Sequence, residues 1–306
     1  MDIFTDTGEL STHIWRIKRN HSLKLWNENR AKPPYTEIVG FIPTMGALHE
    51  GHISLVKKSV ADNPFTVVSI FVNPLQFGPN EDLEKYPRTL ENDSEVLSQA
   101  GADALFHPDV TTFYPSDFLT RVHVSRVTDM YCGASRPGHF EGVTTVVAKL
   151  FGVVQPDVAY FGEKDYQQLV IIRRMVADLN MQIRVAGMPT VRESDGLALS
   201  SRNRYLSAEE RAAAPGLYAA LLEMRRQFDD GVNDAHRLVQ IGMAEMMKRM
   251  GLIDGFKIDY LEIADPDTLV KREAALFDGD RALAAIRLGT TRLIDNIGLW
   301  RERKVN

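Results

Sequence analysis

The sequence predicts a doubly wound α/β domain with a parallel sheet, followed by a smaller C-terminal α/β domain. Along residues 1–190, apolar runs rich in β-branched residues alternate with segments of helical periodicity, as in open parallel sheets. The run TVVSIFV at 66–72 is almost continuously apolar, which is typical of a strand covered on both faces. After residue 190 this alternation stops. We therefore predict one domain at 1–190 and a second, lid-like domain at 191–306.

In the first domain, a helical pattern at 12–29 with Thr12 as its cap ends at the prolines of 31–34. Apolar runs then predict strands at 37–42, 66–72, 102–108, 157–162 and 181–193, with the alternating segment 120–125 as a candidate edge strand. Helices are predicted between them, from His52, at 88–100, at 142–154, and from Lys164 to about Asn180.

The second domain begins with two helical patterns, at 207–229 and 233–250. KIDYLEIAD at 257–265 and ALAAIRLGTTRLIDNI at 282–297 then predict short strands. Two helices followed by strands indicate a separate small α/β unit.

Composition argues against several classes of protein. The net charge is −5 over 306 residues, so no overall positive field attracts nucleic acid. The single cysteine, Cys132, cannot form an intramolecular disulfide and fits a reducing compartment. The first residues lack the pattern of a signal peptide, and no apolar run approaches the roughly 20 residues of a membrane helix. We therefore expect a cytoplasmic protein.

The segment FIPTMGALHEGHISLV at 41–56 carries the most informative chemical pattern. An apolar run stops at Pro43, Gly46 permits a tight turn, and a helical pattern starts directly after His49 and His52. A helix N-terminus attracts phosphate through its N–H groups and its dipole. Two imidazoles there can donate hydrogen bonds to a phosphate whose charge grows during reaction. The segment therefore predicts a site for a nucleoside triphosphate.

The histidine pair has two alternative interpretations. One is a zinc site, but the zincin pattern places histidines at i and i+4, whereas here they stand at i and i+3 with Gly51 between them. The other is a structural role at the helix start, which two histidines beside a glycine turn make less favoured. Cys132 as a nucleophile has weak support, because its neighbours suit a loop.

Neutral amides follow the strand predicted at 66–72. Asn73 and Gln76 would lie at the carboxyl end of that strand, where ligands of open parallel sheets bind. Amides can bind the hydroxyl and carboxylate groups of a polar substrate without adding a charge. The simpler interpretation of both residues is a turn built around Pro74.

A second polar cluster, in FGEKDYQQLV, follows the strand predicted at 157–162. Lys164 can contact phosphate, and Asp165 can accept hydrogen bonds from ribose hydroxyls. Gln168 falls one helical turn after Lys164 and thus on the same face. The alternative is a capping cluster whose charges face solvent.

Two loops carry further candidates. ALSSRNRYLS at 198–207 offers the hydroxyls of Ser200 and Ser201 and the forked guanidinium of Arg202 for phosphate, although a polar helix cap is the commoner role of such a loop. RPGHFEGV at 136–143 offers Arg136 to an anionic substrate, while its His139 fits a structural role in a glycine-rich turn.

These segments together resemble the pantothenate synthetase family, the pantoate–β-alanine ligases. The resemblance rests on PTMGALHEGH, FVNPLQFG, YPRT, RPGHFEGVTTVVAKLF, GEKDYQQ and DGLALSSRN, in that order. It implies a Rossmann-like nucleotidylyltransferase domain and a two-step reaction. ATP and (R)-pantoate would form pantoyl adenylate and pyrophosphate, and β-alanine would then attack the adenylate to give pantothenate and AMP.

The resemblance also implies roles for individual residues. His52, as proton donor, would act with His49 and Lys164 in catalysis. Gln76 and Gln168 would bind pantoate, and our own reasoning adds Asn73 and Arg136 to the substrate site. The implied ATP-binding residues are Met45, Gly46, Ala47, Leu48, His49, Glu50, Gly51, His52, Gly162, Glu163, Lys164, Asp165, Val191, Leu199, Ser200, Ser201 and Arg202.

Magnesium is expected to accompany ATP, but its ligands stay open, because Asn92 occupies a position where some members have Asp, with Asp93 adjacent. The resemblance implies a homodimer. One alternative function is transfer of AMP to a phosphate acceptor such as phosphopantetheine, which would need basic residues in place of Gln76 and Gln168. A nucleotide sensor with a degenerate site would lack residues such as His52, which is present.

Overall fold

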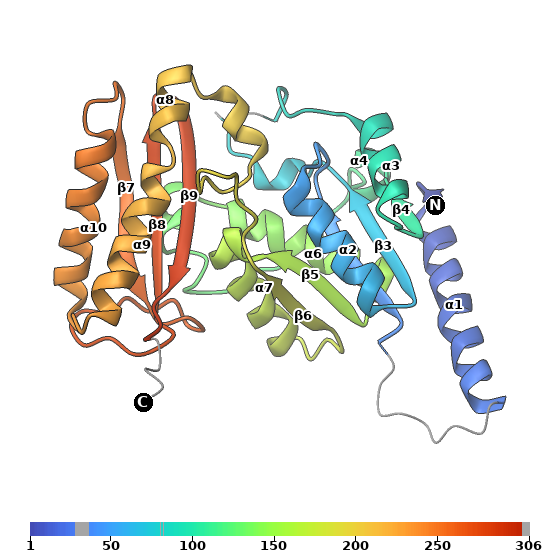
Figure 1. The fold of residues 1–306 in the computed structure, drawn as a ribbon. Coiled ribbons are helices and arrows are strands. Elements are labelled where there is room, and N and C mark those ends of the chain that lie inside the picture. Colours follow the sequence, from blue (N-terminus) through green and yellow to red (C-terminus); the bar gives the residue numbers. More distant parts are fainter. Residues whose placement is uncertain (28–36, 80, 82, 302–306) are drawn as a thin grey trace. The chain divides into compact units, whose positions relative to one another are not determined.

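The chain forms two compact units in a computed structural model, which describes residues 1–27, 37–79, 81 and 83–301 (Figure 1). Unit 1 comprises Met1–Glu163 and Ile171–Met188, and unit 2 comprises Lys164–Val170 and Pro189–Asn306. The boundary predicted at residue 190 and the lid role of the second domain stay predictions. No helix of the described residues combines the length and the apolar composition that crossing a bilayer requires.

Unit 1 is built on a parallel sheet of six strands in the order β1-β4-β3-β2-β5-β6. The strands are β1 (Asp2–Phe4), β2 (Val39–Thr44), β3 (Phe65–Ile70), β4 (Ala104–Phe106), β5 (Val158–Gly162) and β6 (Arg184–Met188). From β2 the chain builds the sheet first toward β3 and β4, and later on the other side through β5 and β6. Ligands of such sheets bind where this direction reverses, at the adjacent carboxyl ends of β2 and β5.

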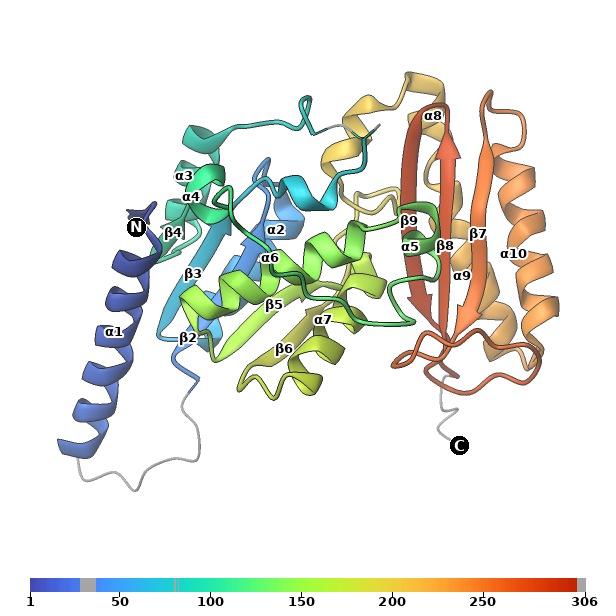
Figure 2. The same ribbon diagram turned by 180° about the vertical axis from the view of Figure 1, so that it is seen from behind.

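Helices cover both faces of this sheet (Figures 1 and 2). The helices within residues 1–188 are α1 (Thr7–Asn27), α2 (Glu50–Asp62), α3 (Leu90–Gln99), α4 (Val110–Phe113), α5 (Cys132–Ser135), α6 (His139–Val154) and α7 (Tyr166–Asp178), of which α5 is a single short turn outside the layers that cover the sheet. On one face, α2 and α3 pack on a core that includes Ile42, Val56 and Leu97. Figure 2 shows α6 in front of the opposite face, where it contacts α1 and β2. The predicted doubly wound arrangement is confirmed.

The N-terminal residues differ from the prediction. The three residues of β1 pair with β4, and a strand so short leaves no periodic signal in the sequence. The first helix begins at Thr7 rather than at Thr12. The Asp6 carboxylate accepts hydrogen bonds from the N–H groups of Gly8 and Glu9, and it therefore caps the helix.

The edge strand predicted at 120–125 is wrong, because the structure assigns no strand there. Both backbone polar groups of Val122 instead bind hydroxyls of α6. Its N–H donates to Thr145 Oγ1 at 3.0 Å, and its carbonyl accepts from Thr144 Oγ1. Side chains of a helix thus take the hydrogen bonds that a neighbouring strand would have taken, and the alternating pattern gave no sign of this.

Unit 2 contains an antiparallel sheet in the order β7-β8-β9, formed by β7 (Lys257–Ala264), β8 (Arg281–Leu288) and β9 (Thr291–Gly298). The short strands predicted within 282–297 are thus β8 and β9, which pair as a hairpin. The helix predicted at 207–229 is two helices, α8 (Ala208–Ala213) and α9 (Gly216–Asp229), because Pro215 lacks an N–H group to continue the first. Together with α10 (Ala235–Met250), α9 packs on the sheet around a core that includes Leu221, Met246 and Leu261.

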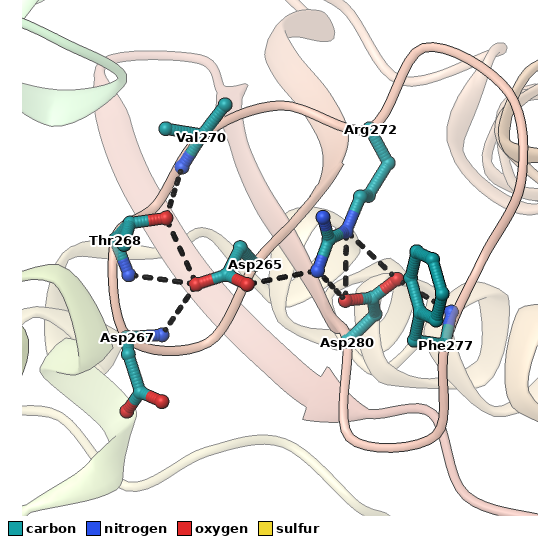
Figure 3. Close-up of polar contacts among 7 residues, drawn as sticks. All are labelled: Asp265, Asp267, Thr268, Val270, Arg272, Phe277 and Asp280. Atoms are coloured by element: carbon teal, nitrogen blue, oxygen red, sulfur yellow. Dashed lines mark hydrogen bonds and ion pairs between the residues drawn. The ribbon is translucent and has the colours of Figure 1, made fainter.

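An arginine with two carboxylates ties together the loop between β7 and β8 (Figure 3). Arg272 Nη2 lies 2.8 Å from Asp265 Oδ2 and 2.8 Å from Asp280 Oδ1. Asp280, which is 1% exposed, also accepts from the Phe277 N–H at 2.9 Å. Burial acts to raise the pKa of Asp265, but hydrogen bonds from Thr268 and the charge of Arg272 outweigh it, so that pKa lies below its usual value. We call Asp265, Arg272 and Asp280 the Arg272 cluster.

Candidate active site

The turn after β2 adopts a conformation that few side chains tolerate. Gly46 has a φ of +81° and Ala47 a φ of +51°. A Cβ atom at Gly46 would lie 3.0 Å from Ile70 Cγ2 and 3.1 Å from Asp93 Oδ2. The Thr44 hydroxyl donates to the Ser69 carbonyl at 2.7 Å and joins the turn to β3. The close contacts and the positive φ together explain why glycine stands at this position.

A buried carboxylate holds this turn. Asp93 is 1% exposed, and its two oxygens accept from the N–H groups of Ala47 and Leu48, each at 2.9 Å. Thr89 Oγ1 donates to the same carboxylate at 3.1 Å. Because both oxygens already accept hydrogen bonds, Asp93 acts in this structure as a support for the turn and not as an open metal ligand.

The two histidines form the N-terminal cap of α2. His49 Nδ1 accepts from the Gly51 N–H at 3.1 Å, and His52 Nδ1 accepts from the His49 N–H at 3.4 Å. The ring centroids lie 4.1 Å apart. A ring nitrogen that accepts carries no proton, so in the neutral form each proton sits on Nε2. Both rings therefore have the tautomer whose Nε2–H can donate to a phosphate.

The same cap changes the role of the helix amides. The sequence predicts that N–H groups at the start of α2 attract phosphate, but the N–H of Gly51 binds His49 Nδ1, and that of His52 donates to the His49 carbonyl at 2.8 Å. These main-chain donors therefore serve the cap. At the carboxyl end of β2, the N–H donors offered to a phosphate are therefore those of the two imidazole rings.

Gln76 lies in a 3₁₀ turn, η1 (Pro74–Gln76), shortly after β3, and Asn73 caps the start of this turn. Asn73 is 1% exposed, and its Nδ2 donates to Gln76 Oε1 at 3.1 Å and to the Gly142 carbonyl at 3.0 Å. Its Oδ1 accepts from Tyr114 Oη at 3.1 Å. Burial raises the pKa of Tyr114, so its hydroxyl keeps the proton that it donates. Asn73 is thus occupied inside the protein and orients Gln76.

Gln76 connects this turn with the histidine-bearing turn. Its Nε2 lies 2.8 Å from the Met45 sulfur. The backbone carbonyl of Gln76 accepts from His139 Nδ1 at 2.8 Å and from Arg136 Nη2 at 3.4 Å. Because an arginine N–H also binds His139 Nε2 at 2.9 Å, His139 carries its proton on Nδ1. The structural role predicted for His139 agrees with these contacts.

The charge of Arg136 is paired. Its Nε and Nη2 donate to the two oxygens of Glu81, each at 2.6 Å. Burial acts to raise the pKa of Glu81, but the hydrogen bonds and the charge of Arg136 outweigh it and keep that pKa below its usual value. We call Glu81, Arg136 and His139 the Arg136 cluster. It acts on the Gln76 backbone, so Arg136 supports a predicted substrate ligand and has its own charge balanced.

Helix α6 approaches η1 so closely that one position admits only glycine. A Cβ atom at Gly142 would lie 2.3 Å from the Leu75 carbonyl oxygen and 2.6 Å from the Gln76 nitrogen, well inside contact distance. The absence of a side chain at Gly142 therefore allows η1, which carries Gln76, to pack directly against the backbone of α6.

In unit 2, Lys164 lies in a 3₁₀ turn, η2 (Glu163–Asp165), and α7 begins only at Tyr166. The helix predicted from Lys164 is therefore wrong at its start, and Lys164 and Gln168 do not share one face of a regular α-helix. The Lys164 carbonyl accepts from Asn296 Nδ2 at 2.9 Å. Lys164 and Gln168 are partly buried, whereas Asp165 is exposed.

In unit 2, residues 191–199 form a narrow hairpin, and η3 (Ser201–Tyr205) follows it. The Leu199 N–H donates to the Val191 carbonyl at 3.0 Å and closes the hairpin. Ser200 caps η3, because its hydroxyl accepts from the Arg202 N–H at 3.3 Å. Ser200, Ser201 and Arg202 thus lie in one short turn, as their sequence spacing predicts. Ser200 also has the capping role that was the alternative interpretation.

Sequence reasoning missed several residues that hold the candidate ligands. Tyr114 and Glu81 lie in segments without a motif, and their role depends on long-range contacts with Asn73 and Arg136. Asp295 and Asn296 had a detectable signal, since they are consecutive polar residues that interrupt the apolar residues Leu293, Ile294 and Ile297 of their strand. Cys132 is buried at the start of α5, which agrees with its weak support as a nucleophile. No group of three potential metal-binding side chains occurs among the described residues.

A doubly wound sheet with a histidine-bearing turn at its switch point defines a nucleotide-binding α/β enzyme. The family model described as Pantoate-beta-alanine ligase matches residues 16–298. The chain therefore belongs to the pantoate–β-alanine ligase family, as the motifs predict.

Relatives support this assignment over most of the chain. The sequence is 54% identical to the pantothenate synthetase of Pseudomonas putida, over 87% of this chain and 91% of that protein. The crystal structure of pantothenate synthetase from Thermus thermophilus superposes with a TM-score of 0.85 at 47% identity and covers 98% of this chain and 100% of that one. The ligase of Francisella tularensis, solved in complex with beta-gamma ATP and beta-alanine, gives a TM-score of 0.72 at 33% identity, with 97% of each chain covered.

Proposed function

We propose that this enzyme condenses (R)-pantoate with β-alanine to form pantothenate, at the expense of ATP and through a pantoyl-adenylate intermediate. It would thereby serve pantothenate (vitamin B5) and coenzyme A biosynthesis. Family membership supports the proposal, together with the relative from Francisella tularensis, whose structure contains beta-gamma ATP and beta-alanine. The observation that carries it is the pair of Nε2–H tautomers, which the cap of α2 fixes at the switch point of the sheet.

In the first step, a carboxylate oxygen of pantoate attacks the α-phosphorus of ATP. The bond between this phosphorus and the bridging oxygen breaks, and pyrophosphate leaves with the electron pair. The Nε2–H groups of His49 and His52 donate to the negative charge that grows on the phosphates, with His52 as proton donor. Lys164 and Arg202 of unit 2 add positive charge. No protein nucleophile is needed, because the substrate supplies the attacking oxygen.

In the second step, the amine of β-alanine attacks the acyl carbon of the adenylate. A C–N bond forms, the bond from the acyl carbon to the AMP oxygen breaks with its electron pair going to AMP, and the amine releases a proton to solvent. Pantothenate and AMP are released. The enzyme contributes by holding amine and adenylate together, which can account for about 7–11 kcal/mol of a reaction barrier.

For pantoate, the proposal assigns the direct contacts to Gln76 and Gln168. The geometry of unit 1 supports an indirect role for two other predicted ligands. Asn73 orients the Gln76 amide, and Arg136 holds the Gln76 carbonyl. Neutral amides suit a substrate that presents hydroxyls and one carboxylate, since they can donate and accept. An acceptor with several phosphates would instead call for cations at these positions.

Magnesium belongs to the proposal as a companion of ATP. The described residues do not form a protein cage for it, because they offer no cluster of three suitable side chains and both Asp93 oxygens already accept hydrogen bonds. Mg²⁺ commonly keeps several waters and binds to substrate phosphates, so the triphosphate would hold most of it. The proposal further includes a homodimer in the cytoplasm, which sedimentation of the purified protein and cell fractionation would test.

Release of pyrophosphate and of AMP from ATP tests the two steps separately. With pantoate alone, we expect pyrophosphate but no pantothenate, because the adenylate forms and stays bound without an amine to attack it. With pantoate and β-alanine together, we expect AMP and pantothenate in equal amounts. Pyrophosphate that appears only when β-alanine is present would contradict the stepwise route. Pyrophosphate release with phosphopantetheine in place of pantoate would favour the alternative of AMP transfer to a phosphate.

A further inference from the structure

Strand β9 contains two consecutive buried polar residues. Asp295 is 3% exposed and Asn296 is 4% exposed. Leu293 and Ile297, two residues to either side of Asp295, belong to the core that α9 and α10 cover. Successive side chains of a strand point to opposite faces, so Asp295 lies on the helix-covered face and Asn296 on the other. Buried polar groups need partners, and the partners of these two residues lie in different segments of unit 2.

Asp295 binds the base of the hairpin at 191–199. Its Oδ2 accepts from Arg192 Nη1 at 2.5 Å and its Oδ1 from Arg192 Nη2 at 2.9 Å. Arg192 also donates to the Gly196 carbonyl at 3.1 Å, and its guanidinium stacks 3.5 Å from the centre of the Tyr218 ring on α9. The contacts with the Asp295 carboxylate, the Gly196 carbonyl and the Tyr218 ring together fix the position of this arginine. The residue before it, Val191, closes the hairpin that leads into Ser200.

Asn296 binds the segment that carries Lys164. Its Nδ2 donates to the Lys164 carbonyl at 2.9 Å, and its Oδ1 accepts from Arg281 Nε at 2.8 Å. A carbonyl can only accept and a guanidinium can only donate, so the orientation of the amide is fixed by its partners. Arg281 in turn stacks 3.9 Å from the centre of the ring of Tyr166, the first residue of α7.

We infer that Asp295 and Asn296 are positioning residues through which a single strand sets two nucleotide-binding segments of unit 2. The inference rests on the proposed function, which assigns Lys164 and the segment 191–202 to ATP. Asp295 holds the segment that contacts adenine and phosphates in the bound ground state, and its loss lowers ATP affinity. Asn296 holds the main chain of Lys164, whose charge matters most as charge develops in the reaction, and its loss lowers the adenylation rate.

Two nearly isosteric variants separate these effects. Asp295→Asn keeps the shape but removes the charge that binds Arg192. Asn296→Asp keeps the contact with Arg281 but turns a donor to the Lys164 carbonyl into a repelling oxygen. Asp280→Asn is the matched control, because Asp280 is a similarly buried carboxylate of the same unit whose partners are Arg272 and Phe277. All three variants are made in the full-length chain.

The measurements are calorimetric titration with a non-hydrolysable ATP analogue, single-turnover pyrophosphate release with pantoate, and hydrogen exchange of the Leu199 amide. For Asp295→Asn we expect analogue affinity to fall by about 10- to 100-fold, as for loss of a charged hydrogen-bond partner, with faster exchange at Leu199. For Asn296→Asp we expect nearly unchanged affinity and an adenylation rate lower by about 10- to 100-fold. Asp280→Asn should lower only the thermal midpoint.

If Asp295→Asn and Asn296→Asp lower the thermal midpoint and change nothing else, as expected of Asp280→Asn, the inference is overturned. If Asp295→Asn fails to fold, Arg192→Lys tests the same contact, because lysine keeps the charge but cannot form the two-pronged pair. Unchanged analogue affinity in Arg192→Lys would equally overturn the role of Asp295. Failure of the proposed function would give a different result, because the wild-type protein would then release no pyrophosphate with pantoate.

Discussion

The Arg136 cluster of unit 1 and the Arg272 cluster of unit 2 both join an arginine to carboxylates at about 2.6 to 2.8 Å. They differ in where the remaining donors go. Arg136 also binds the backbone carbonyl of Gln76, a candidate substrate ligand, and the ring of His139, which binds the same carbonyl. The guanidinium of Arg272 donates to Asp265 and Asp280, and both lie in its own loop region (Figure 3).

This difference indicates that the same kind of ion pair can have two roles. A cluster whose spare donors hold the backbone of a ligand-binding residue affects function through geometry. A cluster that is satisfied by its own loop affects the stability of that loop. Burial and distance alone do not distinguish the two, because both arginines are partly buried and both have short contacts. The partners of the remaining N–H groups do.

The largest effect should come from a direct donor, against which both clusters can be ranked. We expect His52→Ala to slow adenylation by about 10²- to 10³-fold, because one preorganised donor to the developing charge is lost. ATP binding should weaken less. Single-turnover pyrophosphate release and calorimetry measure the two quantities. His52→Asn retains a side-chain amide at the helix cap and serves as the control for loss of the cap. A near-normal rate in His52→Ala would reduce the histidine to a structural role.

Next in size should be loss of the Arg136 cluster. Arg136→Met keeps much of the side-chain length but frees the Gln76 carbonyl and leaves Glu81 unpaired. We expect kcat/KM for pantoate to fall by about 10²-fold, as for a misplaced ligand, with ATP affinity nearly unchanged. Gln76→Ala, which removes the amide itself, should act on the same parameter. If Arg136→Met instead weakened ATP binding and spared pantoate, the two substrates would be assigned the wrong way round.

An effect of similar size, but on the stability of the protein and not on catalysis, is expected from the other cluster. Arg272→Met leaves Asp280 buried without its charge partner, which should lower the free energy of unfolding by about 3 kcal/mol. Because the Arg272 side chain is 23% exposed, this value lies at the low end for such pairs. Denaturant unfolding measures it. The kinetic constants of the folded enzyme should not change, and a selective loss of pantoate-dependent activity would break the comparison.

The smallest effect should be a dependence on pH. Because the folded-state pKa of Glu81 lies below its usual 4.5, the Arg136 cluster contributes its full stability above pH 4.5 and loses it as the pH falls through the lowered pKa. Thermal midpoints between about pH 6 and about pH 3 should therefore fall less steeply in Glu81→Gln than in the wild type. Parallel curves for the two proteins would show that Glu81 is not held in its charged form by Arg136.

The sequence predicts the parallel sheet well, because β3 and β5 are buried on both faces and appear as almost continuously apolar runs. It also predicts the turn at Gly46 and the position of His49 and His52 beside it, because a turn and a helix start depend on neighbouring residues. The hydrogen bonds that orient those side chains were not predictable. Asp93 reaches Ala47 across 46 positions, and Asn73 reaches Gly142 across 69.

Local pattern also failed where a side chain replaces a backbone partner. The segment 120–125 alternates like a strand, but Val122 binds hydroxyls of α6. Within 207–229 the helical periodicity continues through Pro215, although the backbone hydrogen bonds do not. In both cases the spacing of apolar residues fits the predicted element. The partners of the backbone N–H and carbonyl groups, however, cannot be predicted from that spacing.

Asp93 gives the turn after β2 a property that separates it from glycine-rich phosphate loops. In such loops the main-chain N–H groups converge on the anion and recognise it as a ring of amides. Here the N–H groups of Ala47 and Leu48 donate to a carboxylate of the protein itself. The turn therefore carries an internal anion, and an incoming phosphate is left to the side chains. At this turn, the contact with phosphate should accordingly depend on the chemistry of two imidazoles, whereas in a glycine-rich loop it depends on the shape of the backbone.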